Sequence, residues 1–150
     1  MKAAKTTRLL IIDDNDLVCD ALSRWFGRNP AFEFLGAVTD GKAALEAVER
    51  LEPDMVLLDI DIPHRSGLDI LAEIIRSRPR TNVLMLSGHL KREYIEKSLK
   101  LGARGYVLKD VRVPDLAEMI HRAAAGAQVL CNASQATLRG VDESVILASP

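Results

Sequence analysis

Acidic side chains stand where short apolar runs of this sequence stop. The run 55–58 ends at Asp59, and an earlier run, 8–12, ends at Asp13 and Asp14. Short apolar runs of this kind are typical of strands that are buried on both faces of a parallel sheet. Because ligands bind at the carboxyl ends of such strands, we expect these three carboxylates to stand at the mouth of one site.

Three carboxylates in one pocket would repel one another. At a separation of about 5 Å and an effective dielectric constant near 20, each pair costs roughly 3 kcal/mol before screening. Lys109, which ends a later apolar run, offsets only part of this repulsion. Hard carboxylate oxygens with no histidine or cysteine among them are the ligands that Mg²⁺ prefers, so we predict a divalent cation, Mg²⁺, in this pocket.

A metal-bound aspartate beside a lysine and a hydroxyl group is suited to phosphoryl transfer. Asp59 could attack an electrophilic phosphoryl group while Mg²⁺ and Lys109 neutralise the equatorial oxygens. Ser87, at the end of the run 83–86, could donate a hydrogen bond to one of these oxygens. The protein itself would be the product, so we expect a phosphoacceptor and not an enzyme that turns over a substrate.

Five apolar runs alternate with five amphipathic patterns and would position these residues. The runs lie at 8–12, 32–38, 55–58, 83–86 and 102–108, and the helical patterns at 17–26, 41–51, 68–76, 91–100 and 114–125. This alternation calls for a parallel sheet that is covered on both faces through right-handed crossovers. We therefore predict an α/β fold, a doubly wound five-stranded parallel sheet of flavodoxin-like (βα)5 type with strand order 2-1-3-4-5.

Composition limits the classes of protein to consider. The 150 residues are 48% hydrophobic, enough for one core, and the net charge of -1 gives no global attraction to nucleic acid or to an anionic membrane. The apolar run behind the basic start is too short for a signal peptide or a membrane span, so we expect a cytoplasmic protein. Cys19 and Cys131 have neither disulfide-framework nor zinc-site spacing.

The motifs together resemble the response-regulator receiver domain of two-component signalling. They are the Asp13-Asp14 pair, Asp59 in LLDIDIP, Ser87 in LMLSG, and Tyr106 with Lys109 in GYVLK. The resemblance runs from about residue 8 to 125. It suggests a receiver domain at 1–126 and a C-terminal tail or interdomain linker at 127–150, within which residues 132–138 could form one short helix.

The resemblance implies a phosphorelay role for the acidic pocket. Asp59 would accept a phosphoryl group from the phosphohistidine of a sensor histidine kinase. Asp14 and Asp59 would ligate Mg²⁺, with Asp61 ligating through its backbone carbonyl and Asp13 through water.

The resemblance also implies a switch. Lys109 would pair with the phosphate. The Ser87 hydroxyl would move to the phosphate, and the ring of Tyr106 would turn inward behind this hydroxyl. The output face would be the charged helix 91–100 with its flanking strand and the last helix. His89 lies two residues after Ser87, at the rim of the pocket, and we hypothesise that it tunes the lifetime of the phosphate.

The sequence leaves two possibilities for the output of the receiver. The segments GYVLKD and 126–130 are similar to receivers that precede a LuxR-type DNA-binding domain of the NarL class. The chain could be a stand-alone receiver or the receiver part of a longer transcriptional regulator, and DNA would be contacted only through an effector domain outside these 150 residues. A homodimer could form through the 91–125 face or through the first and last helices.

Two rival functions use similar features. Haloacid-dehalogenase-like phosphatases carry a nucleophilic aspartate and a second acid two residues later, as Asp59 and Asp61 do, but on their first strand and with further motifs and usually a cap. A flavodoxin would share the fold. Its first loop cradles phosphate with hydroxyl and N–H groups, whereas the acidic loop 13–16 would repel phosphate unless a metal intervened.

Overall fold

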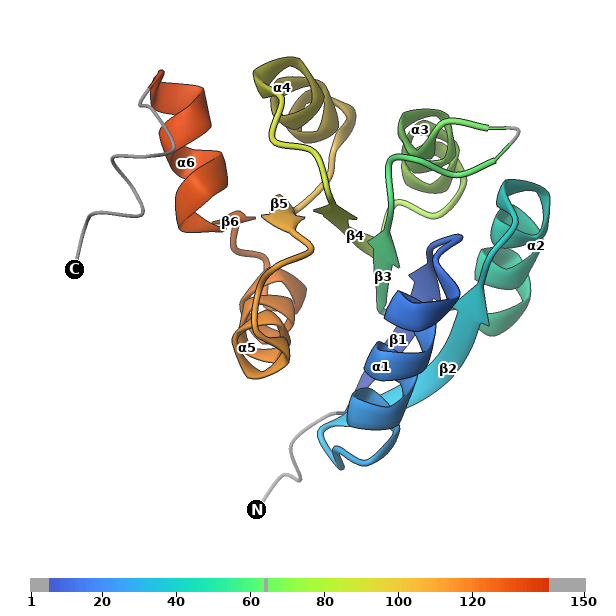
Figure 1. The fold of residues 1–150 in the computed structure, drawn as a ribbon. Helices are drawn as coiled ribbons and strands as arrows, with labels where there is room; N and C mark the ends of the chain where they lie inside the picture. Colours follow the sequence, from blue (N-terminus) through green and yellow to red (C-terminus); the bar gives the residue numbers. More distant parts are fainter. Residues whose placement is uncertain (1–5, 64, 141–150) are drawn as a thin grey trace.

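A twisted parallel sheet with helices on both faces forms the molecule (Figure 1). The computed structural model describes residues 6–63 and 65–140. The strands are β1 (Thr7–Ile12), β2 (Phe32–Val38), β3 (Met55–Leu58), β4 (Asn82–Ser87), β5 (Gly105–Leu108) and β6 (Val129–Leu130). The helices are α1 (Asp16–Gly27), α2 (Gly41–Leu51), α3 (Gly67–Ser77), α4 (Arg92–Leu101), α5 (Val113–Ala124) and α6 (Asn132–Arg139).

The strand order is β2-β1-β3-β4-β5-β6 and all pairs are parallel. The predicted α/β class and the order of the first five strands are confirmed, but the predicted count of five strands is wrong. The sixth strand has only two residues, so it leaves no periodic pattern in the sequence. It is recognisable only from its pairing with β5.

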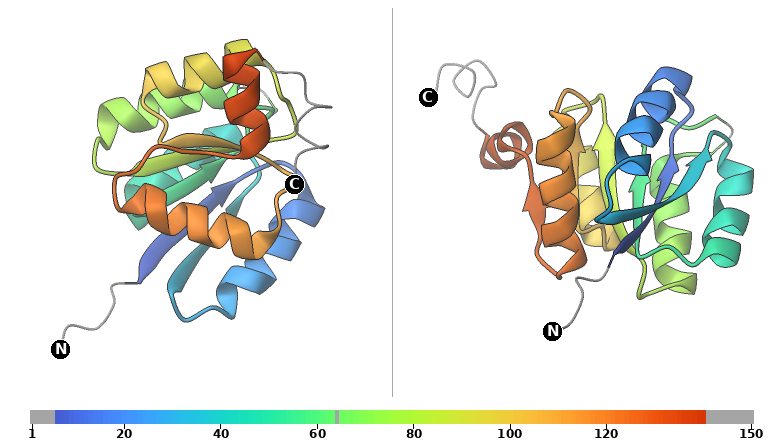
Figure 2. Two further views of the ribbon diagram at one scale, coloured as in Figure 1. Left: turned by 90° about the vertical axis from the view of Figure 1, so that its left-hand side faces the viewer. Right: turned by 90° about the horizontal axis from the view of Figure 1, so that it is seen from below.

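Two hydrophobic cores lie on opposite faces of the sheet. Helices α2, α3, α4 and α6 cover one face, and α1 and α5 cover the other (Figures 1 and 2). Successive residues of β1 point to alternate cores: Leu10 and Ile12 enter the first, and Leu9 and Ile11 the second. Both faces of the strand are therefore apolar, which explains the uninterrupted apolar runs of the sequence.

Side-chain caps mark the beginning of three helices. The Asn15 side chain accepts hydrogen bonds from two N–H groups of α1, Asp40 caps α2, and Ser66 caps α3. The Asn15 cap turns the chain directly after Asp13 and Asp14, which keeps both carboxylates at the carboxyl end of the sheet.

Two glycines allow close backbone contacts. A Cβ at Gly67 would lie 2.0 Å from the carbonyl oxygen of Asp59, and one at Gly105 would lie 1.7 Å from the carbonyl oxygen of Val129. Gly67 is therefore the tightly packed first residue of α3 and not part of a flexible turn. Gly105 is what lets β6 approach β5.

After α5, the chain forms β6 and α6. The helix expected at 132–138 is confirmed as α6, whereas Val141–Pro150, expected to be a linker or tail, lies outside the described residues. Among the helices of the described part, none is long and apolar enough to cross a membrane.

The contact at Gly67 generates a prediction for stability. Gly67→Ala should lower the free energy of unfolding by about 1–3 kcal/mol, because the new methyl group overlaps backbone that cannot move without shifting Asp59. Gly27→Ala is the matched control, since a Cβ there meets nothing within 4 Å and alanine favours the helix by up to about 1 kcal/mol. Urea denaturation of both variants measures the difference. Equal stabilities would contradict the packing role of Gly67.

Candidate functional site

Strand register brings Asp13 and Asp59 together. Ile12 of β1 lies opposite Leu58 of β3, so the residue that follows each strand is an aspartate. The Asp59 N–H donates to the Ile12 carbonyl at 2.9 Å, which extends the ladder by one residue. Both carboxyl groups are nearly excluded from solvent, since Asp13 is 2% exposed and Asp59 is 3% exposed.

The same ladder places Ser87 and Lys109 on the other side of Asp59. Leu58 lies opposite Met85, two residues before the end of β4 at Ser87. Ser87 in turn lies opposite Leu108, and the Lys109 N–H donates to the Ser87 carbonyl at 2.9 Å. The lysine is therefore the first residue beyond β5, with its side chain directed to the acidic residues.

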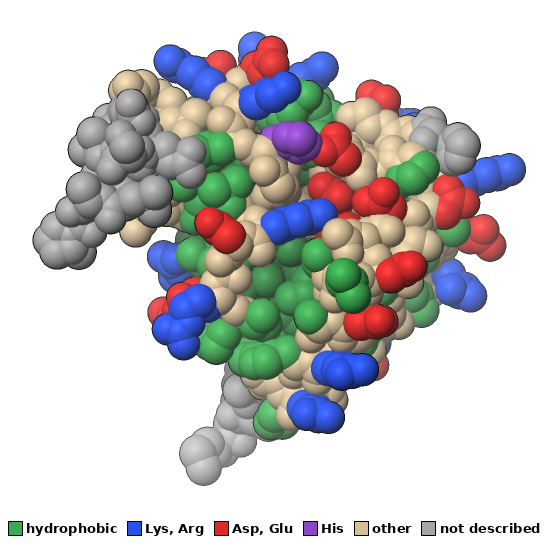
Figure 3. Space-filling view, viewed as in Figure 1, with side chains coloured by type: hydrophobic (Ala, Val, Ile, Leu, Met, Phe, Trp, Pro, Cys, Tyr) green, Lys and Arg blue, Asp and Glu red, His purple; other side chains and the backbone are tan. Residues whose placement is uncertain are grey.

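A compact acidic cluster results. One carboxylate oxygen each from Asp13, Asp14 and Asp59 lies within 4.8 Å of the others, and Asp14 is the exposed member. The Lys109 ammonium lies 2.9 Å from Asp13 Oδ2 and 3.0 Å from Asp59 Oδ2. Figure 3 shows acidic side chains gathered at this end of the sheet. The charge of one lysine leaves a net negative site, and a donor set of oxygens alone could hold a hard divalent cation.

Burial and charge shift the protonation of this cluster. Burial raises the pKa of the Asp59 carboxyl and the charge of Asp13 adds to the effect, whereas the hydrogen bond from Lys109 opposes it. Burial alone would lower the pKa of Lys109, but its hydrogen bonds to Asp13 and Asp59 outweigh burial, so the pKa is raised. The lysine is therefore held charged while ionised Asp59 is disfavoured in the absence of a cation.

Hydrogen bonds from the surrounding chain hold the two buried aspartates. The Asn15 N–H donates to Asp13 Oδ1 at 2.9 Å, and the Asp61 N–H donates to Asp59 Oδ1 at 3.2 Å. The Cys19 thiol donates to the Asp13 carbonyl at 3.2 Å. Burial and the neighbouring Asp13 raise the pKa of this thiol to about 11, so it stays a donor. The sequence showed only that Cys19 lacks disulfide-framework and zinc-site spacing, and it carried no signal for this contact.

Ser87, His89 and Tyr106 form a second linked group beside the cluster. Ser87 is fully buried, and its hydroxyl oxygen accepts from the His89 N–H at 3.0 Å. The Tyr106 hydroxyl donates to the His89 carbonyl at 2.6 Å, with the ring fully buried. Burial raises the pKa of this tyrosine, so it stays protonated. The backbone of His89 thus connects the two predicted switch residues.

The side chains of His89 and Asp61 are hydrogen-bonded to each other at the rim of the site. The pair joins the loop after β4 to the loop after β3. Both residues were singled out from the sequence, one for phosphate lifetime and one for its backbone carbonyl, but their contact was not predicted. Residues 28 positions apart on different loops give no pairing signal in one sequence.

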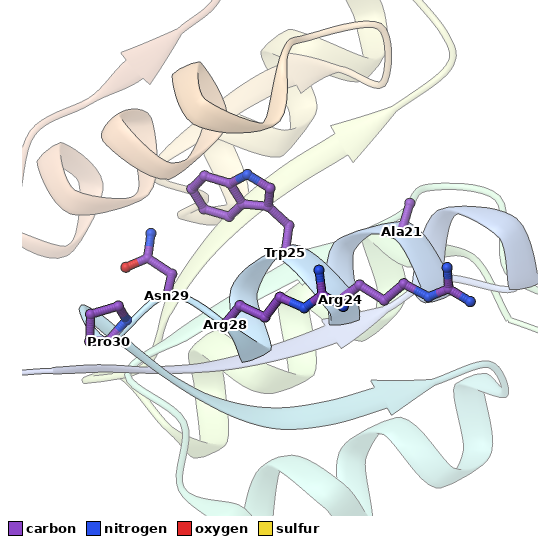
Figure 4. A pocket seen from close by; sticks show the side chains of 6 residues that line it. All are labelled: Ala21, Arg24, Trp25, Arg28, Asn29 and Pro30. Atoms are coloured by element: carbon purple, nitrogen blue, oxygen red, sulfur yellow. The ribbon is translucent and has the colours of Figure 1, made fainter.

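A shallow pocket of about 570 Å³ lies elsewhere, along the later turns of α1 and the turn that follows (Figure 4). The acidic cluster is at the beginning of α1, so this pocket is separate from it. It contains no carboxylate. Its lining residues are Ala21, Arg24, Trp25, Arg28, Asn29 and Pro30.

Comparison with known proteins agrees with this geometry. The model of the response regulator receiver domain matches residues 9–121. The chain is 34% identical over 122 residues to the uncharacterised transcriptional regulatory protein YvfU of Bacillus subtilis, covering 81% of this chain and 61% of YvfU. It is 31% identical over 133 residues to the nitrate/nitrite response regulator NarL of Escherichia coli, covering 89% of this chain and 62% of NarL. The chain therefore spans somewhat less than two thirds of the length of these relatives.

Solved structures are similar to this chain as well. A DNA-binding response regulator of the LuxR family from Staphylococcus aureus superposes with a TM-score of 0.74 at 29% identity, over 79% of this chain and 98% of that chain. A two-component response regulator of the LuxR family from Aurantimonas shares the fold with a TM-score of 0.85 at 22% identity, over 91% and 97%. The chain therefore belongs to the response regulator receiver domain family, and its relatives are regulators of the LuxR and NarL type.

Proposed function

We propose that Asp59 is the phosphoryl acceptor and that a sensor histidine kinase is the donor. A carboxylate oxygen of Asp59 attacks the phosphorus of the kinase phosphohistidine, the phosphorus–nitrogen bond breaks, and the imidazole leaves. The product is an acyl phosphate on this chain. The observation that carries the proposal is the placement of a nearly buried Asp59 carboxylate against Lys109, with Asp13 and Asp14 beside it.

The proposal includes Mg²⁺ as the cofactor. Asp14 and Asp59 would ligate the ion with carboxylate oxygens, Asp61 with its backbone carbonyl, and Asp13 through water. The oxygen-only donor set and its excess negative charge fit a hard divalent cation. Bound Mg²⁺ supplies positive charge to the equatorial oxygens during transfer. Lys109 contributes a second cation, held in place by its two carboxylate partners.

Ser87 and Tyr106 would carry the signal from Asp59 to the α4 side of the molecule. A phosphoryl group brings between one and two negative charges and strong acceptors to the site, which is enough to bias a bistable element by a few kcal/mol. Ser87 ends β4, the strand next to β3, and its hydroxyl is buried. The backbone of His89 links this hydroxyl to that of Tyr106, whose ring is already inward, which supports a coupled response of the two residues.

We infer that this receiver, at residues 1–126, serves a transcriptional regulator. The relatives YvfU and NarL are regulatory proteins longer than this chain, and a solved relative is described as DNA-binding. DNA contact would belong to an effector domain joined through the 127–150 segment. A stand-alone receiver is the second candidate. The haloacid-dehalogenase-like phosphatase is disfavoured, because Asp59 follows β3 and not the first strand.

Self-association is best supported on the α1–α5 side. Leu17 is 80% exposed at the start of α1, and Val111 and Val113 before and within the start of α5 are only partly buried. Figure 3 shows hydrophobic side chains gathered between α1 and α5. The alternative face at 91–125 carries the charged helix α4, which is partly covered by α6. We therefore propose the first and last receiver helices as the homodimer surface.

The acceptor assignment generates the first functional prediction. Incubation with acetyl phosphate and Mg²⁺ should add one phosphoryl group to the wild type and none to Asp59→Asn, because an amide oxygen is a poor nucleophile at phosphorus. Asp16→Asn, an exposed acid in the first turn of α1, is the control and should react like the wild type. Intact-protein mass spectrometry measures the product. Equal modification of Asp59→Asn and wild type, or steady turnover of phosphomonoesters, would overturn the assignment.

The charge balance of the cluster generates a second prediction. Folding raises the pKa of Asp59, so the ionised carboxylate destabilises the folded state. This loss of unfolding free energy develops as the pH rises through and above the ordinary pKa of a carboxyl group. Without metal, Asp59→Asn should therefore be more stable than wild type at neutral pH, and the difference should shrink in acid.

Mg²⁺ should reverse this order at neutral pH. At a hundred times its dissociation constant, the ion would stabilise the wild type by about 2.7 kcal/mol and Asp59→Asn by clearly less, because one ligand is lost. Thermal unfolding with and without Mg²⁺ at two pH values measures both effects. A metal response that is the same in the two proteins would contradict the proposed ligand set.

The His89–Asp61 contact generates a third prediction. His89→Ala should change the dephosphorylation half-life of the acyl phosphate, because the His89 side chain holds Asp61, whose N–H is bonded to the Asp59 carboxylate. Asp61→Asn should change it in the same direction, and the double variant should show no further change. The decay is followed by mass spectrometry. An unchanged half-life in His89→Ala would dismiss the role.

A further inference from the structure

Helix α6 lies on the surface where the output face was expected. It contacts α4, β5 and β6, and Figures 1 and 2 show it beside α4 on the same face of the sheet. Leu130, before α6, and Leu138, within it, pack against the core cluster that contains Tyr106. The flank of β5 that a five-stranded sheet would leave open is therefore covered.

The covered flank of β5 restricts the conformational change that is available to Tyr106. Its ring is already buried and its hydroxyl is already bonded to the His89 carbonyl. An inward turn of the ring on phosphorylation is thus no longer available from this arrangement. A change at Asp59 that reaches this face must be expressed by another element, and α4 and α6 are the two helices in contact there.

The attachment of α6 is weaker than that of the strand before it. β6 is paired with β5 through a close contact at Gly105, and Val129 is buried. Within α6, the hydrogen bonds of Gln135 and Thr137 go to Leu130 and to the helix itself. In residues 6–63 and 65–140, no hydrogen bond or ion pair joins α6 to α4 or β5.

Small side chains and one leucine make up most of the α6 interface. Ser134 and Ala136 are buried in α6, Ser98 is buried in α4, and Leu138 is the only large apolar residue of α6. The Ser134 and Ser98 hydroxyls bond within their own segments, to Cys131 and to the Tyr94 carbonyl. Undocking α6 would therefore leave no polar group of the interface without its partner. An eight-residue helix held by so little apolar contact belongs to the low-stability end of a fold.

A short covalent route connects the acceptor site to this contact. The Ser87 hydroxyl oxygen accepts from the His89 N–H at 3.0 Å, and α4 begins three residues later at Arg92. If the hydroxyl moves to a phosphoryl group on Asp59, this bond lengthens and the 88–91 loop must shift. Because α4 continues directly from the loop, its contact with α6 shifts as well.

We propose that α6 is a detachable cover of the α4–β5 surface, docked in the unmodified chain and released when Asp59 is phosphorylated. The inference rests on the proposed acceptor role of Asp59. Release needs only a modest difference in affinity of α6 for the two states of α4, since its docking is weak to begin with. By linkage, loosening α6 must also favour the phosphorylated state.

Hydrogen exchange of the full chain tests the proposal, with beryllofluoride and Mg²⁺ as the probe. Loading should slow exchange in the 59–61 and 87–89 loops and should speed exchange in residues 133–139 by about fivefold or more, without an equal change in β5. Slower loop exchange with unchanged or slower α6 exchange would overturn the inference and leave the acceptor role intact. No response in the loops would count against the acceptor role, and the inference would fall with it.

A variant pair gives a second readout. Leu138→Ala removes the large apolar contact of α6 and should bind beryllofluoride with Mg²⁺ about fivefold more tightly than wild type. Arg139→Ala, on the exposed side of the same helix, is the control and should bind like wild type. In unloaded Leu138→Ala, α6 should exchange faster while β5 keeps its protection. Simultaneous loss of protection in α6 and β5, or unchanged affinity, would show that α6 is part of the rigid core.

Discussion

The Lys109 ammonium between Asp13 and Asp59 is the interaction on which the site depends. It lies within 3.0 Å of both carboxylates. Without it, burial and the repulsion between the two carboxylates would disfavour their ionised forms. Three carboxylates and one ammonium still leave excess negative charge. A hard divalent cation would therefore be favoured there. If Asp59 accepts a phosphoryl group as proposed, that cation would offset the negative charge which the group adds to an acidic pocket.

The register of the parallel strands brings these charged residues together. A parallel ladder aligns the ends of neighbouring strands, so β1, β3 and β5 can each end on a charged residue at the same edge. The sequence was informative here because apolar runs that stop abruptly on acids or a lysine mark strand ends directly. The bounds of β2 and α2 agree with the predicted 32–38 and 41–51, and the Asp40 cap marks the beginning of α2.

Contacts between loops could not be predicted in the same way. The His89–Asp61 pair, the Cys19 thiol on the Asp13 carbonyl and the approach of Gly67 to Asp59 all join positions whose distance in sequence carries no periodic signal. The sixth strand was missed for a related reason. Two residues cannot show alternation, and only the open edge of β5 gives them a partner. What the sequence omits is therefore tertiary contact between segments that lie far apart along the chain.

The two faces of the sheet differ in how they reach the site. On the α1–α5 face, Asn15 and Cys19 hold Asp13, so this face fixes the acidic pocket itself. On the opposite face, the backbone of His89 is hydrogen-bonded to both the Ser87 and the Tyr106 hydroxyls, and the loop that carries it leads directly into α4. If Asp59 is the acceptor as proposed, this face would carry the response to phosphorylation, whereas the α1–α5 face would hold the pocket. Self-association on the α1–α5 face need not then interfere with signalling on the α4 face, because the two surfaces share no helix.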